Sequence, residues 1–592
     1  MPPARCSRSL LLLLLLSCGQ ALLASRKEAW VEVRSPHFVA YSDAGEAEAR
    51  KALAGFEGIR SVFGTVFPDI RVDPPKPMIL LVTRDEASMK RFVPDAFLGE
   101  DPKRSAGVFL PGPDRNYAIL RLDVDLRADQ PYFVLFHEYT HGIVRLNFPS
   151  LPVWLDEGIA DFYGATEIHS ERVYLGRVPK GRLERLRSGL YLPLETLLKV
   201  THDSPFYQEG EKTGIFYAES WALVHYLFTD PQARKAGMLQ AYMKALTGAV
   251  DPLEAARAGF GDLKQVQESL TAYARRSIFT FWDLPLAVKL TDKEFRVRAL
   301  DEAEALVVRA EFLMRGPHEP ESRPLLDQAL ALAPERPEVQ AAVQAARGED
   351  FLLRGEREKA RQAFEAALRL GSQDFRVPYE LARLAQGHQA GPPVSPAQIL
   401  AWLDAAEKLR PDFPGLHMAR CRQYADDPRD PDRALAEGRA AVEAEPQNLA
   451  TRANFGSVCM SLDLEAEAKL IGQQLGRLAA TSQERAMVES YTASLAQFLE
   501  RRKAEALVVP PAGGHGNAPF KSSNVALPLK FTLSSHLAPL GQEVMRLAGE
   551  GKTQEAIRRV EKALAKADNA YDRKTLRSLL DTLRARIGQT GR

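Results

Sequence analysis

Cysteine is scarce in this sequence, which has 592 residues and only four cysteines. Cys6 and Cys18 lie in the leucine-rich N-terminus, so the rest of the chain has only Cys421 and Cys459. This count excludes a disulfide framework and a zinc site made of cysteines. One bridge between Cys421 and Cys459 stays open, but their helical surroundings favour two buried, unpaired thiols.

An excess of charge of either sign is also absent. The chain has 78 Lys and Arg against 77 Asp and Glu. Such a balance is not typical of a protein whose main partner is nucleic acid or an anionic membrane, so neither is expected. The length predicts several domains, because a single core seldom exceeds about 250–300 residues.

Long apolar runs are absent after the N-terminus. Arg5 and Arg8 precede the run Leu10–Leu16, and small residues follow it. This order predicts a signal peptide over residues 1–24, export to the periplasm or the cell exterior, and no membrane span after its removal. An uncleaved anchor stays open. So does a lipid on Cys18, because "LLSC" resembles a lipoprotein cleavage box, although leucine stands where a smaller residue is usual.

Residues 28–290 predict an α+β domain with a mixed sheet followed by a helical half. "WVEVRSPHFVAYSD" (residues 30–43) has period-two apolar positions, and "PMILLVTR" (77–84) is a short apolar run typical of a buried strand. "AGVFLPG" (106–112) and "NYAILRLD" (116–123) predict a β-hairpin.

The second half of this domain, residues 130–290, is predicted to be mainly helical. "GIFYAESWALVHYLF" (214–228) is strongly apolar and is expected to be an internal helix. "FTFWDLPLAVKLTDKEFRV" (279–297) has a looser composition, and we expect it to lead out of the domain.

Residues 301–500 change to a composition rich in Ala, Leu, Glu and Arg and predict an all-α repeat region. Four segments align without gaps and end 37, 40 and 35 residues apart, at Pro334, Gly371, Pro411 and Pro446. This period resembles that of tetratricopeptide repeats, which would offer a concave surface to a protein partner. An unrelated alanine-rich helical bundle is the alternative.

The C-terminus is predicted to contain a linker and a further helical pair. Residues 505–535 have the composition of a flexible loop, and "GKTQEAIRRVEKALAKADNAY" (551–571) resembles one more repeat within residues 536–592.

The chemistry of the chain is concentrated in "FHEYTHGIVRLNFPSLPVWLDEGIADFYG" (136–164). On a helix, His137 and His141 leave the same face, so both imidazoles can bind one metal ion. Glu138 lies one position round from His137, where it can act as general base on a water at the metal rather than as a ligand. Charged groups among so many apolar neighbours are costly unless they bind something charged.

A catalytic zinc needs a third protein ligand. A second helix after the turn at Pro149 and Pro152 would return Glu157 toward His141. Glu157 and Asp161 share one helix face, so Glu157 is the expected ligand and Asp161 the expected acceptor for a histidine N–H. Asp156 remains a competing ligand, and Asp161 could instead be an ordinary solvated charge.

These motifs resemble the gluzincin metallopeptidases, most closely the bacterial family called peptidase MA-like, in which HExxH is followed by W-L-x-E-G-x-A. The resemblance covers roughly residues 28–290. It implies zinc bound by His137, His141 and Glu157, with Glu138 as general base. "FYAESWALVHYL" also resembles a family segment, in which Tyr217 would stabilise the oxyanion. Tyr217 and His225 could equally be core residues.

The sequence therefore predicts an exported zinc metallopeptidase that hydrolyses a peptide or protein and has helical repeats for a partner. The alternative is a repeat-based binding scaffold whose zinc-peptidase-like domain is structural or inactive.

Overall fold

The computed structural model describes residues 29–507 apart from short internal gaps, together with parts of 540–583. The gaps are residues 95–105, 113, 125–130, 149, 190, 209, 247–250, 317–318, 387–390 and 426–430. The expected signal peptide and Cys18 lie outside the described residues. Among the helices described, none is both long and apolar enough to cross a bilayer.

A six-stranded mixed sheet forms the N-terminal part, in the order β4-β5-β3-β2-β1-β9. β2 and β3 pair in parallel, as do β3 and β5, whereas β1–β2, β4–β5 and β1–β9 are antiparallel. The predicted strands and the predicted hairpin are all present. The strands are β1 (Trp30–Arg34), β2 (Val39–Ser42), β3 (Met78–Thr83), β4 (Gly107–Leu110), β5 (Asn116–Arg121) and β9 (Arg296–Leu300).

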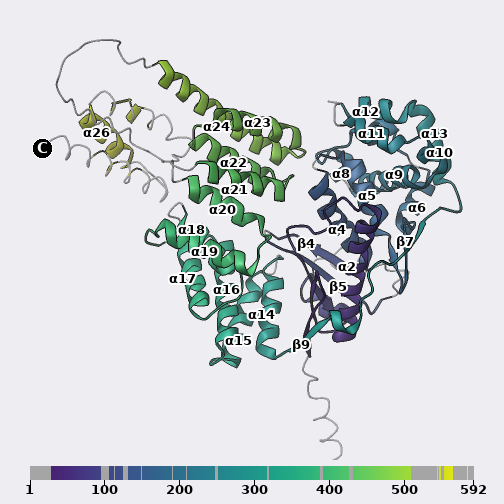
Figure 1. Ribbon diagram of the computed structural model, residues 1–592, viewed down its shortest axis with the longest axis horizontal. Helices are drawn as coiled ribbons and strands as arrows, with labels where there is room; N and C mark the ends of the chain where they lie inside the picture. Colours follow the sequence, from purple (N-terminus) through teal and green to yellow (C-terminus); the bar gives the residue numbers. More distant parts are fainter. Residues whose placement is uncertain are drawn as a thin grey trace, which may run out of the picture. The chain divides into compact units, whose positions relative to one another are not determined.

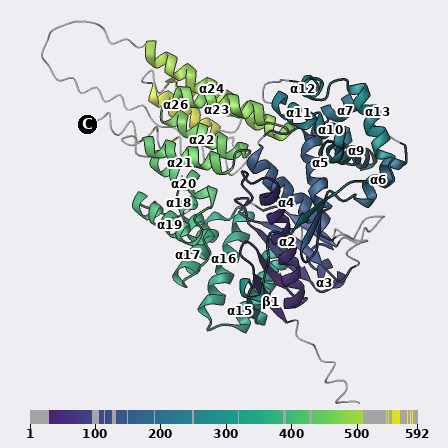
Figure 2. The same cartoon turned by 45° about the vertical axis from the view of Figure 1, so that its right-hand side comes forward.

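Alternating residues of the central strands serve two different cores. Leu80 and Val82 pack with α2 (Glu46–Val66) and with α4 (Tyr132–Asn147), whereas Leu81 packs on the other side. That other side is covered by α3 (Glu86–Lys90) and α14 (Glu302–Leu313). The period of two in the sequence thus places helices on both faces of the sheet (Figures 1 and 2).

The helical half of this part contains strands that the sequence did not indicate. β6 (Glu167–Ile168), β7 (Arg172–Leu175) and β8 (Trp282–Pro285) form a small antiparallel sheet. The segment 279–297, expected to be loose, supplies β8 and leads into β9. The large sheet therefore extends past residue 290, where the sequence suggested that the domain would end.

The remaining helices of this half are α5 (Val153–Gly164), α6 (Lys180–Arg187), α7 (Leu194–Lys199), α8 (Pro205–Gln208), α9 (Gly210–Thr229), α10 (Pro231–Lys235), α11 (Met238–Leu246), α12 (Pro252–Phe260) and α13 (Leu263–Ala274). Most of them pack around α9, and α5 lies between α9 and α4.

The following part is an array of helical hairpins, as the repeat pattern predicted. The four aligned segments coincide with the ends of α15, α17, α19 and α21, each the second helix of a hairpin. The helices are α14, α15 (Ser322–Leu332), α16 (Pro337–Leu353), α17 (Arg357–Arg369), α18 (Arg376–Ala385), α19 (Pro396–Leu409), α20 (Pro414–Ala425), α21 (Pro431–Ala444), α22 (Leu449–Ser461), α23 (Glu465–Leu478) and α24 (Ser482–Leu507). Cys421 and Cys459 are buried and unpaired.

Buried ion pairs join the β4–β5 turn to the hairpins. Arg376, 4% exposed, pairs with Glu349 of the hairpins and lies 3.9 Å from a carboxylate oxygen of Asp114 in the turn. Arg115 in the turn lies 3.8 Å from Asp374. Because buried charges require partners, these side chains fix the hairpins against the sheet.

Residues 509–592 form a second compact unit. Its described residues include α26 (Thr553–Leu564) and a small apolar core that contains Val544, Val560 and Leu576. The expected linker begins inside α24, and residues 508–539 lie outside the described residues.

Candidate metal centre

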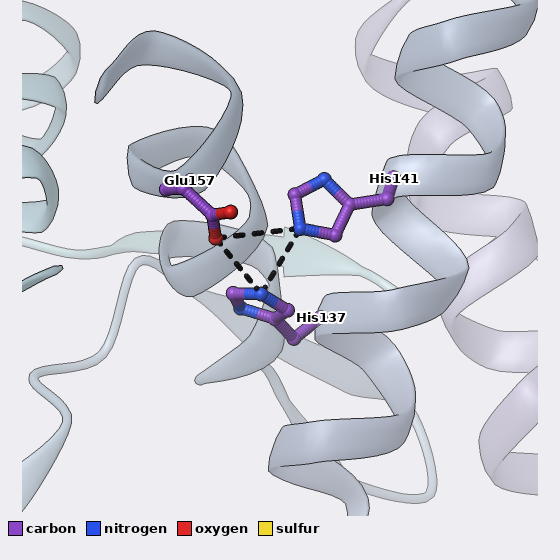
Figure 3. Close-up of side chains that lie close together, drawn as sticks. All are labelled: His137, His141 and Glu157. Atoms are coloured by element: carbon purple, nitrogen blue, oxygen red, sulfur yellow. Dashed lines mark hydrogen bonds and ion pairs between the residues drawn. The ribbon is translucent and has the colours of Figure 1, made fainter. Parts of the chain in front are cut away.

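Three polar atoms converge between α4 and α5 (Figure 3). His137 Nε2 lies 3.1 Å from His141 Nε2, and Glu157 Oε2 lies 3.2 and 3.4 Å from these two nitrogens. The three residues are 8%, 5% and 3% exposed. They are also the one group of histidine, cysteine and carboxylate side chains with ligand atoms this close among the described residues.

Two glycines of α5 allow neighbouring helices to pack closely against it. A Cβ on Gly164 would lie 3.0 Å from the Phe133 carbonyl oxygen and 3.3 Å from His137 Cβ. A Cβ on Gly158, which follows Glu157, would lie 2.4 Å from the Ser220 carbonyl oxygen. Because Gly158 has no side chain, α9, which also carries Tyr217, can pack closely against α5.

Each histidine uses its other ring nitrogen to bind a carboxylate. His137 Nδ1 lies 2.9 Å from Asp161 Oδ1, and His141 Nδ1 lies 2.9 Å from Asp156 Oδ1. Asp156, considered above as a competing ligand, therefore contacts the outer side of His141 rather than the point of convergence. When Nδ1 carries the ring proton, each Nε2 presents a lone pair toward Glu157.

Glu157 is oriented through its second oxygen. Tyr207 on α8 donates a hydrogen bond of 2.9 Å to Glu157 Oε1. The Tyr217 ring stacks beside that of Tyr207, with ring centroids 6.1 Å apart. Tyr217 thus lies at the site, with its ring centroid 6.3 Å from that of His137.

The charges of the site are strongly coupled. Burial opposes protonation of both histidines, but the carboxylates beside them outweigh it and raise the pKa of His137 and of His141. Burial alone would raise the pKa of Glu157, yet the facing imidazoles hold it well below its usual range. A metal ion has to displace these protons, as at any histidine site.

The donor set fits a zinc ion. Tetrahedral zinc with bonds of about 2.0–2.1 Å keeps its ligand atoms about 3.3 Å apart. The three distances here, 3.1, 3.2 and 3.4 Å, match the edges of such a tetrahedron. Glu157 Oε2 also meets no donor in hydrogen-bonding geometry among the described residues, although it is buried. Three protein ligands leave one coordination position for water or substrate.

Glu138 differs from the two histidines of α4. It is half-buried, and no hydrogen bond or ion pair to its carboxylate is found among the described residues. The carboxylate is therefore free to interact with a ligand.

Two neighbours of the centre were missed from the sequence. Tyr207 contacts Glu157, and Arg182 on α6 forms an ion pair of 2.6 Å with Asp161. His225, by contrast, is a core residue, as one interpretation allowed. It bonds to the Tyr273 hydroxyl and the Gly176 carbonyl, and burial lowers its pKa to about 4.

A comparison with known protein families gives a match to this region, but the matching family has no assigned activity. A family model described as a protein of unknown function (DUF1570) matches residues 136–247. That interval contains every residue of the centre named above. No curated protein is significantly similar to this chain.

Part of the chain is similar to solved structures, one of which is a helical-repeat protein. It is titled "Crystal structure of YrrB: a TPR protein with an unusual peptide-binding site". The identity is 18%, the alignment covers 32% of this chain and 92% of that chain, and the TM-score is 0.26. A TM-score this low carries no argument about what this chain binds.

Proposed function

We propose that this chain is a zinc-dependent metallopeptidase. The observation that carries the proposal is the convergence of His137, His141 and Glu157 at distances that suit one tetrahedral ion. A zinc ion there would supply Lewis acidity, which polarises a carbonyl oxygen and lets water lose a proton near neutral pH.

The residues of the chain would have separate tasks. Glu138 would accept the proton of the attacking water and deliver it to the leaving amine, because it follows His137 on α4 and its carboxylate has no partner among the described residues. Asp161 and Asp156 would hold the imidazoles in the tautomer that presents Nε2. Tyr207 would hold Glu157.

A peptide could reach the centre along β4. This strand lies at the edge of the sheet, and Gly107 at its start is packed against Leu135 of α4. An extended substrate could add to that edge by backbone hydrogen bonds, a general mode of peptide recognition.

Glu138→Gln tests the proposal, because it keeps the size of the side chain and removes its ability to accept a proton. Zinc content should stay at the wild-type level, while hydrolysis of a peptide library should fall at least ~10²-fold. Glu268→Gln, an exposed glutamate on α13, is the matched control and should change neither quantity. Equal hydrolysis by wild type and Glu138→Gln would refute the mechanism.

The second candidate is a protein-binding scaffold with an inactive centre. It is favoured by the array of hairpins from α14 to α24, an architecture suited to holding another protein. If wild type and Glu138→Gln both carry zinc and neither cleaves any peptide in the library, the scaffold becomes the better proposal.

A further inference from the structure

Arg182 contacts the candidate centre from α6, a helix with no proposed ligand of its own. Its Nε lies 2.6 Å from Asp161 Oδ2, and its Nη2 lies 3.2 Å from Asp161 Oδ1. The same Oδ1 is the atom that lies 2.9 Å from His137 Nδ1. A two-pronged ion pair of this kind fixes the plane of a carboxylate as well as its charge.

The two carboxylates that bind the histidines differ in what stabilises their charge. The Asp161 side chain is 0% exposed, so water cannot solvate it. The Asp156 side chain is 14% exposed, and no cation other than His141 pairs with it among the described residues. A fully buried carboxylate stays ionised only with a countercharge, and Arg182 supplies it for Asp161.

Arg182 also contacts Tyr217, whose ring stacks beside that of Tyr207. Its guanidinium carbon lies 4.8 Å from the centre of the Tyr217 ring. The centroids of the stacked Tyr217 and Tyr207 rings lie 6.1 Å apart, and Tyr207 donates a hydrogen bond to Glu157. One guanidinium therefore supports both the Asp161–His137 pair and the tyrosines that reach Glu157.

We propose that Arg182 is a positioning residue of the centre, which orders His137 through Asp161 and Glu157 through Tyr217 and Tyr207. The inference rests on the proposed function, since it takes His137 and Glu157 as metal ligands. It assigns Arg182 no contact with the metal or the substrate.

Removing the guanidinium should weaken metal binding without removing a ligand. Changes to groups that orient ligands typically cost 10–100-fold in metal affinity, and we expect that range for Arg182→Gln. Arg182→Lys keeps the charge but not the fork or the planar face over Tyr217, so its loss should be smaller but measurable.

The experiment measures binding of Zn²⁺ and Co²⁺ to the full chain by competition with a chelator, with the visible spectrum of the Co²⁺ form as a second readout. Arg182→Gln should bind both ions 10–100-fold more weakly and shift the Co²⁺ bands. Arg187→Gln, an exposed arginine on the same helix, is the matched control and should leave both unchanged. Circular dichroism of the metal-free proteins checks their folding, and Arg182→Lys decides the question if Arg182→Gln does not fold.

A double-mutant cycle separates positioning through Asp161 from a general loss of structure. If Arg182 acts partly through Asp161, adding Arg182→Gln to Asp161→Asn should cost less affinity than it costs alone. Wild-type affinity and an unchanged Co²⁺ spectrum in both Arg182 variants would overturn the inference. A wild-type chain that binds neither ion would refute the proposed function itself, a distinct outcome.

Discussion

Substitution of Phe312 by alanine tests whether the sheet and the first helical hairpin share one core. Phe312 lies on α14, is 2% exposed, and packs edge-on against Tyr117 and Phe92, with ring centroids 5.0 and 6.3 Å away. Phe312→Ala removes both ring contacts and leaves a cavity. Such a change costs about 3–5 kcal/mol, and two aromatic pairs favour the upper half of that range. We expect about 4 kcal/mol.

Hydrogen exchange resolved by peptide measures where that free energy is lost. If the core is shared, amides of β3 and β5 should lose protection together with those of α14, because all of them open with the same core. Leu353→Ala is the matched control: this leucine on α16 is 55% exposed, and its loss should cost within about 0.5 kcal/mol.

Unchanged protection of β3 and β5 in Phe312→Ala, with faster exchange confined to α14 and α15, would refute the shared core.

The same reasoning applies to truncation of the chain. A chain that ends at residue 300 would lack α14 and expose one face of the sheet, so we expect it not to fold alone. The change of composition near residue 301 alone would predict a domain boundary there, whereas α14 shares a core with the sheet.

Two further predictions concern the metal ligands and a buried acid. His137→Ala, His141→Ala and Glu157→Ala should each lose zinc on dialysis, measured by mass spectrometry of the metal. Full occupancy in Glu157→Ala would show that another group completes the site. Burial raises the pKa of Glu219 to about 8. Between about pH 4.5 and pH 8 the native state therefore holds a proton that the unfolded chain has released. The free energy of unfolding of the wild type falls over this range as pH rises. Glu219→Gln should therefore gain stability relative to wild type between pH 5 and pH 8, by at most about 1.4 kcal/mol per pH unit in urea unfolding; the same difference at both pH values would contradict this.

The part of the site that lies on α4 and α5 could be predicted from the sequence because its spacing is local. His137 and His141 are one helical turn apart, and a short turn returns Glu157 and Asp161 beside them. Arg182 and Tyr207 are different. They lie 21 and 50 residues from the carboxylates that they contact. No periodicity marks such pairs, and an arginine or a tyrosine on a short helix is unremarkable by itself.

Strand β9 is a part of the fold that likewise could not be predicted from the sequence. Its residues "RVRAL" are exposed except for Leu300, because β9 is an edge strand that one helix covers only in part. The period-two pattern that revealed β1 and the apolar run that revealed β3 are therefore both missing. What defines β9 is its pairing with β1, far away in the sequence.

The last hairpins and the segments that carry the centre are physically connected. Gln447 donates a hydrogen bond of 2.8 Å to the carbonyl of Phe148, at the end of α4. Arg71 bridges the carbonyls of Leu146 and Glu443, at 2.7 and 3.0 Å.

A second connection reaches the segment that holds Tyr207. The Ser482 amide, at the start of α24, donates to Asp203, which lies four residues before Tyr207 in the sequence. Carbonyls at a helix end lack partners within their own helix. Removing the hairpins would therefore take away the partner of the Phe148 carbonyl, and it would also take away the amide that binds Asp203. Any loss of zinc or of hydrolysis in a shortened chain would therefore not separate an enzyme from a scaffold. That distinction requires single substitutions in the full chain, where the contacts between the hairpins and α4 remain intact.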